Sequence, residues 1–315
     1  MIIGGIYRYV SATPPEPFIT IWETTAAGEV LNFPAGPVGT FDYEIDWGDG
    51  TVENYNTSAH VSHIYAIAGE YTITVLGQFP SFRLADDINT RDKIREVVQL
   101  GITGWENLYA AFNGAFSMRS VNLGINDTSA VQDFSFMFSA GFKVTSMVGF
   151  ETMDVSSATT LQQMFNSNGI LTTPPDVSTW DTSNVTNMGS VFKNCDAFTT
   201  APDCSGWDTS NTTIMAEMFY NCAGIGATVV DSIINFDTHN VFASDGEDMT
   251  RLIPNIPTAE YDKLLIAWGD GRAVGGSIRF YADGAKYTGG GAAEAGRNVL
   301  DNAPNNWFFF DGGVV

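Results

Sequence analysis

Apolar residues return at intervals of 27 residues through the middle of the chain. The clearest row is Phe138, Phe165, Phe192 and Phe219, which Phe112 precedes by 26 residues. Other rows keep the same register, among them Asp127, Asp154, Asp181 and Asp208, and also Val97, Leu123, Phe150, Val177 and Cys204. Because independent rows share one register, the pattern predicts a run of stacked structural repeats.

Within one repeat the pattern predicts a short strand, a tight turn and a short helix. Residues 175–178 read as extended, and Val185, Met188 and Phe192 then follow at the helical spacings of three and four. Asp181 and Ser183 precede these residues, and either is placed to cap the helix. A unit of this length cannot bury its apolar face alone, so we expect the units to stack into a solenoid with strands about 4.8 Å apart.

The clearest copy of the repeat resembles a known family. Residues 180–188 read Trp-Asp-Thr-Ser-Asn-Val-Thr-Asn-Met, residues 191–195 read Val-Phe-Lys-Asn-Cys, and residues 207–222 hold a second close copy. These motifs resemble the repeat of BspA-like leucine-rich-repeat surface proteins. The resemblance implies a leucine-rich-repeat solenoid, assigned to residues 91–256, in a displayed, adhesive or structural protein. Such proteins occur on bacterial surfaces and, in similar form, among bacteriophage proteins.

The segment before the repeats predicts an antiparallel β-domain, because residues 18–84 alternate apolar and polar positions between turn signals. Residues 47–50 read Trp-Gly-Asp-Gly, and residues 63–65 read His-Ile-Tyr. These motifs are similar to those of a PKD domain, an immunoglobulin-like β-sandwich, and the similarity implies a spacer or attachment module over residues 18–90. The proline-rich end of residues 1–17 predicts a stiff linker behind a separate N-terminal arm.

Residues 257–315 are expected to cover the last repeat as an α/β capping region. The spacing predicts a helix capped by Thr258, a hairpin around residues 283–284, a second helix near residues 292–300 and a strand at 307–310. The predicted fold class is therefore mainly β with α: a β-sandwich, a solenoid of 26–27-residue units and an α/β cap.

The charge of the chain excludes some classes of partner. Acidic residues outnumber basic ones by 36 to 14, which gives a net charge of −22. Nucleic acids and anionic membranes bind basic faces, so neither is an expected partner. No apolar window approaches the roughly 20 residues of a membrane span, and the N-terminus lacks the features of a secretory signal. Three cysteines argue against a disulfide framework, and Cys195, Cys204 and Cys222 are expected to be reduced.

Only a calcium site is a candidate for metal chemistry. Asp42, Asp46 and Asp49 surround the Trp-Gly-Asp-Gly turn and could supply carboxylate oxygens to Ca²⁺, with stabilisation of the turn as the alternative. No nucleophile elbow, phosphate loop or dinucleotide fingerprint occurs in the sequence. The sequence thus predicts a protein that is not an enzyme and has no other cofactor.

A binding face is expected at the outward positions of the predicted strands. Strand alternation places there Asn122, Gly149, Asp176 and Asp203, with Glu151, Ser178 and Ser205 nearby. This polar, acidic surface could suit a carbohydrate or a cationic protein patch, and a merely solvated face is the alternative.

Three functional hypotheses follow from the sequence. The first is a bacteriophage virion component at the virion surface, docked to other virion proteins by its N-terminal part, with host-surface protein or carbohydrate as its ligand. It is favoured because the resemblance implies display while no export signal is recognised. The second is a bacterial cell-surface adhesin, and the third is an accessory part of a carbohydrate-active enzyme.

Overall fold

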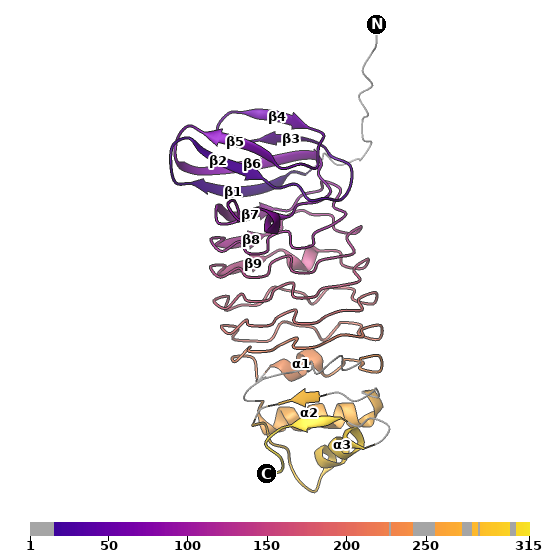
Figure 1. Ribbon diagram of the computed structural model, residues 1–315. Helices are drawn as coiled ribbons and strands as arrows, with labels where there is room; N and C mark the ends of the chain where they lie inside the picture. Colours follow the sequence, from indigo (N-terminus) through magenta and orange to yellow (C-terminus); the bar gives the residue numbers. More distant parts are fainter. Residues whose placement is uncertain (1–15, 227, 242–255, 273–278, 283, 303–306) are drawn as a thin grey trace.

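The protein is mainly β, as the sequence predicts (Figure 1). The computed structural model describes residues 16–226, 228–241, 256–272, 279–282, 284–302 and 307–315. The strands are β1 (Phe18–Thr24), β2 (Glu29–Phe33), β3 (Asp42–Asp46), β4 (Val52–Tyr55), β5 (Val61–Tyr65), β6 (Gly69–Gln78), β7 (Ile94–Gln99), β8 (Ser120–Asn122), β9 (Ser146–Val148), β10 (Arg279–Tyr281) and β11 (Phe308–Phe310). The helices are η1 (Leu84–Asp86), η2 (Phe150–Thr152), α1 (Val229–Ile233), α2 (Thr258–Ala267), η3 (Trp268–Arg272) and α3 (Ala292–Asp301).

The N-terminal part consists of two sheets over an aromatic core. The larger sheet has seven strands in the order β4-β3-β6-β1-β7-β8-β9, and the smaller one pairs β2 with β5. Alternation in β1 turns Phe18 and Trp22 inward, where both are fully buried. Phe33 of the small sheet meets Phe18 of the large sheet and Trp47 just after β3, with ring centroids 6.2 Å apart in both pairs.

The large sheet continues from the N-terminal part into the repeats. β7 pairs antiparallel with β1 and parallel with β8, and β8 pairs parallel with β9. Phe18 also lies 5.3 Å from the ring of Trp105, so the apolar core is shared as well. The boundary assigned between residues 90 and 91 stays a prediction, and both hydrogen bonds and core packing cross it.

Beyond β9 the chain forms a stack of coils, each coil being one unit of 26–27 residues (Figure 1). One parallel β-bridge joins each coil to the next: Asp133 pairs with Thr160, Thr160 with Asn187, and Asn187 with Ile214. Next to each bridge, every second backbone N–H donates to a carbonyl of the following coil, as Phe136 does to Gln162 at 2.9 Å and Phe138 to Met164 at 2.9 Å. The coils are therefore held together by hydrogen bonds parallel to the stack.

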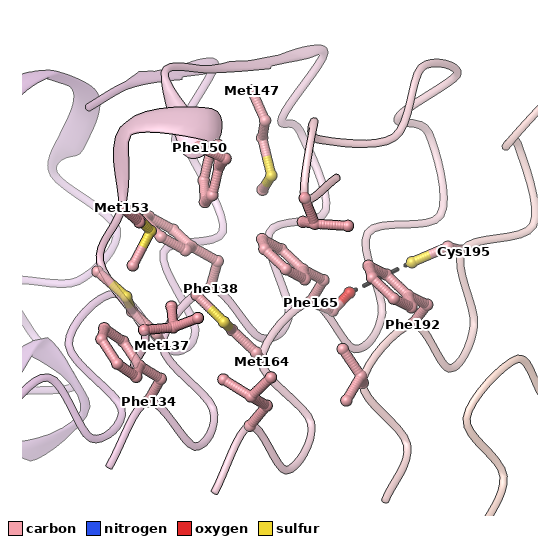
Figure 2. Close-up of a cluster of buried hydrophobic side chains, with 14 of the residues drawn as sticks. Phe134, Met137, Phe138, Met147, Phe150, Met153, Met164, Phe165, Phe192 and Cys195 are labelled. Atoms are coloured by element: carbon pink, nitrogen blue, oxygen red, sulfur yellow. Dashed lines mark hydrogen bonds between the residues drawn. The ribbon is translucent and has the colours of Figure 1, made fainter. Parts of the chain in front are cut away.

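The row of phenylalanines forms a continuous column inside the stack. The ring centroids of Phe112, Phe138, Phe165, Phe192 and Phe219 are 5.0, 6.3, 5.5 and 5.7 Å apart in turn, and neighbouring planes differ by 9° or less. All five rings are buried. Figure 2 shows the middle of this column, with Met164 and Phe150 packed beside it.

The helix expected after Asp181 does not form, and this expectation was wrong. Residues 181–195 run as tight turns, and Ser190 and Asn194 have positive φ angles of 58°. The reason lies in the hydrogen bonds: Ser190 N–H donates to Ala216 and Phe192 N–H to Met218, in the next coil, rather than four residues back. Successive tight turns reproduce the three-and-four spacing of a helix. The strand expected at residues 175–178 is also absent, although Val177 is buried.

The C-terminal part follows the last coil and contains α2 and α3, which confirms both predicted helices. Tyr261, Leu264 and Leu265 of α2 are buried. Thr258 is the first residue of α2 and does not cap it. The predicted hairpin is wrong: β10 pairs in parallel with β11, because α3 lies between them in the chain and returns it to the same edge. In the part of the chain that the structure describes, no helix has the length and apolarity to cross a bilayer.

Candidate binding surface

Aspartates recur in successive coils, and we call them the acidic ridge: Asp127, Asp154, Asp181 and Asp208 in one row, with Asp176 and Asp203 in a second row. Each ridge carboxylate accepts the backbone N–H two residues further on, as Asp181 does from Ser183 at 3.1 Å. The hydrogen bonds from the Ser183 hydroxyl and N–H lower the pKa of Asp181. Asp181 thus caps a tight turn instead of the predicted helix, and it stays ionised at neutral pH.

The predicted binding-face residues lie on or beside this ridge. Asn122, Asp176 and Asp203 occupy equivalent turns, in which Asp176 accepts from the Ser178 N–H at 3.1 Å and hydroxyl at 2.6 Å. The Ser205 N–H and hydroxyl donate to Asp203 in the same way. These side chains are exposed, as is Glu151 in η2. Gly149 breaks the row, because it has no side chain and adopts a φ of +85°.

Two of the three calcium candidates, Asp46 and Asp49, use their carboxylates inside the turn that follows β3. Asp46 Oδ1 accepts from Gly48 N–H at 2.9 Å, and Asp49 Oδ1 accepts from Thr51 N–H at 3.0 Å. Asp49 Oδ2 lies 2.7 Å from His63 Nε2, and Asp42 is exposed on β3. Among the residues that the structure describes, no group of three or more His, Cys, Asp or Glu side chains is placed to hold a metal ion.

The Trp-Gly-Asp-Gly and His-Ile-Tyr motifs meet in one cluster of contacts. The Trp47 and His63 rings stack with centroids 5.0 Å apart, and Tyr65 Oη donates to the Trp47 carbonyl at 2.8 Å. Partial burial raises the pKa of Asp49. The hydrogen bonds from His63 and Thr51 together lower it by more than burial raises it, so the net shift of the pKa is downward. The contacts of Trp47 with His63 and Tyr65 therefore hold the turn that follows β3 against β5.

The buried thiols take part in packing. Cys195 and Cys222 occupy equivalent positions in successive coils. The Sγ atom of Cys195 lies 3.2 Å from the carbonyl oxygen of Phe165 (Figure 2), and the Sγ atom of Cys222 lies 2.9 Å from the carbonyl oxygen of Phe192. Burial raises the pKa of Cys195 and of Cys204 well above that of an ordinary thiol. All three cysteines are free and buried, so they are poor nucleophiles.

A second surface, which the sequence did not reveal, is the wall of the stack that carries the bridges between coils. We call it the turn wall; it comprises residues 107–116, 133–142, 160–169, 187–196 and 214–223. Aromatic and basic side chains pair on it: Arg83 lies over Tyr109 at 5.1 Å, Arg91 over Phe116 at 4.6 Å, and Lys193 over Tyr220 at 5.0 Å.

The turn wall also carries an exposed aromatic column. Phe116 and Phe142 stack with centroids 5.2 Å apart and planes 5° from parallel, and Phe142 is 52% exposed. On the neighbouring row Asn194 Nδ2 lies 3.4 Å from Asn166 Oδ1, and Asn221 Nδ2 lies 3.3 Å from Asn194 Oδ1. The 26-residue spacing of Phe116 and Phe142 is the sequence signal that could have identified this wall.

The comparisons with known proteins concern the stack alone. Residues 106–232 match the model of a family described as Mycoplasma protein of unknown function, DUF285. This segment includes the repeats that resemble those of BspA-like proteins, and it leaves out β1 to β7 and the capping region. No curated protein and no solved structure matches the chain significantly.

Proposed function

We propose that the protein is a non-enzymatic, surface-displayed binding and structural protein. The observation that carries this proposal is the stack itself. Its coils are stacked on one buried column of phenylalanines, so equivalent side chains recur once per coil along the acidic ridge and the turn wall. A regular surface of this kind suits contact with an extended partner. The match of residues 106–232 to a family model supports a repeat protein, and the BspA-like resemblance of the same residues supports display.

In this proposal the coils are a leucine-rich-repeat solenoid and the N-terminal sheets are a PKD-like sandwich. The 27-residue register and its buried phenylalanine column support the solenoid. The two facing sheets and the stacked Trp47 and His63 of the motif turn support the sandwich. The sandwich would act as a spacer between the point of attachment and the coils.

For the site of display we propose the virion surface, with the bacterial cell surface as the alternative. Docking by residues 1–17 to other virion proteins is part of the virion proposal; residues 1–15 lie outside the described part of the chain. The test is immunogold labelling of the native source with antibody against residues 16–226. Label on released particles supports the virion component, and label on cell envelopes supports the adhesin. Label confined to the cytosol of cells that release no particles would overturn both.

A deletion tests the docking step separately. Removal of residues 1–17 should leave the protein folded but absent from purified particles. Full incorporation of the shortened protein would exclude the N-terminal arm as the anchor.

A further inference from the structure

We propose that the turn wall holds a binding site for a guanidinium group, in a gap between Phe142 and Asp196. The inference rests on the proposed display function and names the chemistry of the partner: an arginine side chain of a basic protein segment. The site starts from the column of Arg91, Phe116 and Phe142. Phe142 stacks on one face of the Phe116 ring, so Arg91 takes the other face, with its guanidinium carbon 4.6 Å from the ring centre.

The gap arises because the column is interrupted by a glycine. In the 27-residue register Gly169 follows Phe142 and Asp196 follows Gly169, so the position equivalent to Phe142 in the following coil carries no side chain. Space is available there: apart from neighbours in the chain, the only atom within 4 Å of a Cβ added to Gly169 is the carbonyl oxygen of Asn194, at 3.8 Å. The 52% exposure of Phe142 agrees with an open ring face.

The groups around the gap select a cation. The Phe142 ring offers a negative π face, the Asn194 carbonyl is an acceptor, and the Asp196 carboxylate is an exposed acceptor that also binds Asn221 Nδ2 at 2.9 Å. A guanidinium has only donors and a flat face, so it satisfies all three, whereas the hydroxyl groups of a sugar would also need donors. Arg91 already makes the ring contact within the same column, and the net charge of −22 attracts basic partners.

Lys143 is the basic side chain next to Phe142, and it is exposed. Its charge opposes a second cation in the gap and is screened by solvent. Lys143→Gln should therefore strengthen the binding of a guanidinium about twofold. A variant that failed to fold would bind more weakly instead, so the two effects are distinguishable.

The test measures binding of fluorescent hexa-arginine to the full chain by anisotropy at about 0.15 M salt, where weak surface attraction is screened. Gly169→Phe fills the gap without a change in charge and should weaken binding about tenfold. Gly291→Phe, just before α3, where an added Cβ meets open space, is the matched control and should bind as the unaltered protein does. Hexa-citrulline, which has the same shape without the charge, should bind at least tenfold more weakly than hexa-arginine.

A second pair of variants covers the case in which Gly169→Phe does not fold. Asp196→Asn should weaken hexa-arginine binding more than Glu44→Gln, at an exposed residue of β3, although both remove one negative charge. Equal affinities in either pair of variants would overturn the site. So would binding of the neutral glycan laminarin that Gly169→Phe abolishes, because it would assign the gap to sugars. Immunogold labelling remains unaffected by these outcomes, so failure of this site and failure of the display proposal are distinguishable.

Discussion

At the scale of single residues, the protein depends on rows of side chains that repeat once per coil. Phe192 shows the buried kind of row: its ring lies 5.5 Å from Phe165 and 5.7 Å from Phe219, and it is fully buried. Phe142 shows the exposed kind, because it stacks on Phe116 yet keeps half of its surface in solvent. The same residue type thus has two different roles within the repeats.

We predict that Phe192→Ala lowers the free energy of unfolding by about 3–5 kcal/mol, because it leaves a cavity between two stacked rings. Urea unfolding followed by circular dichroism measures the change. Phe142→Ala is the control and should cost less than about 1 kcal/mol, since no core contact is lost. Equal losses in the two variants would mean that the column is not buried as described.

The positive φ angles along the turn wall offer a second residue-scale prediction. Ala140 has a φ of 62°, and Gly114 has a φ of 73° at the equivalent place one coil earlier. Ala140→Gly should raise the free energy of unfolding by about 0.5–1 kcal/mol, because the strain of a left-handed residue exceeds the entropy that glycine adds to the unfolded chain. Ala197→Gly, at a residue without positive φ, should instead lower it. Destabilisation by both changes would contradict the assigned turn geometry.

At the scale of elements, the register of the repeats was predictable but the conformation within a repeat was not. The 27-residue period correctly placed Phe138, Phe165 and Phe192 in one row. It could not reveal that the N–H of Phe192 donates to the next coil, because a helix and a series of tight turns give the same apolar spacing.

The same limit explains why the candidate site was only partly predictable. Asp176 and Asp203 are exposed as expected, since short polar motifs with Ser two residues on reveal local turns. The turn wall was missed because a helix and a series of tight turns expose different residues, and a helix was predicted. The gap at Gly169 was missed because it is formed by Phe142, Gly169 and Asp196, which come from three successive coils.

An ion pair between elements gives a pH-dependent prediction. Lys93, just before β7, lies 2.9 Å from Glu29 of β2. The hydrogen bond from Lys93, together with those from Thr25 and Ala26, lowers the pKa of Glu29 to about 2, although partial burial acts in the opposite direction. A lowered folded-state pKa stabilises the fold above the unfolded value near 4.5, and this contribution disappears as the pH falls through about 2.

We therefore expect Glu29→Gln to be less stable than the unaltered protein at pH 7, by up to about 1 kcal/mol because the pair is partly exposed. The difference should persist to about pH 5 and shrink towards pH 2. Urea unfolding at pH 7, 5 and 2 measures it. A difference that stays constant over this range would show that the Glu29 carboxylate is not the titrating group.

The sheet that crosses from β1 to β7 predicts how fragments behave. A fragment of residues 16–90 lacks β7, which pairs with β1, and Trp105, which packs on Phe18. A fragment of residues 16–126 contains both, so it should unfold at a higher urea concentration and with a steeper transition than residues 16–90. Equal midpoints and slopes would show that the N-terminal sheets are independent of the coils.

At the scale of the whole molecule, one apolar core runs from the N-terminal sheets through the coils to the C-terminal part. Each coil contacts mainly its neighbours, so stability should be close to a sum of coil and interface contributions. This organisation allows the length of the stack to change without a change of fold.

The most direct test of this account is the deletion of one complete coil, residues 160–186. The deletion joins Thr159 to Asn187, which occupies the same place in the register as Thr160, and it brings Phe192 beneath Phe138 in the column. Circular dichroism during thermal unfolding should show a folded protein with a cooperative transition, while deletion of residues 160–172 alone should prevent folding. Loss of folding in the complete-coil deletion, or equal behaviour of the two, would contradict the stack of interchangeable 27-residue coils.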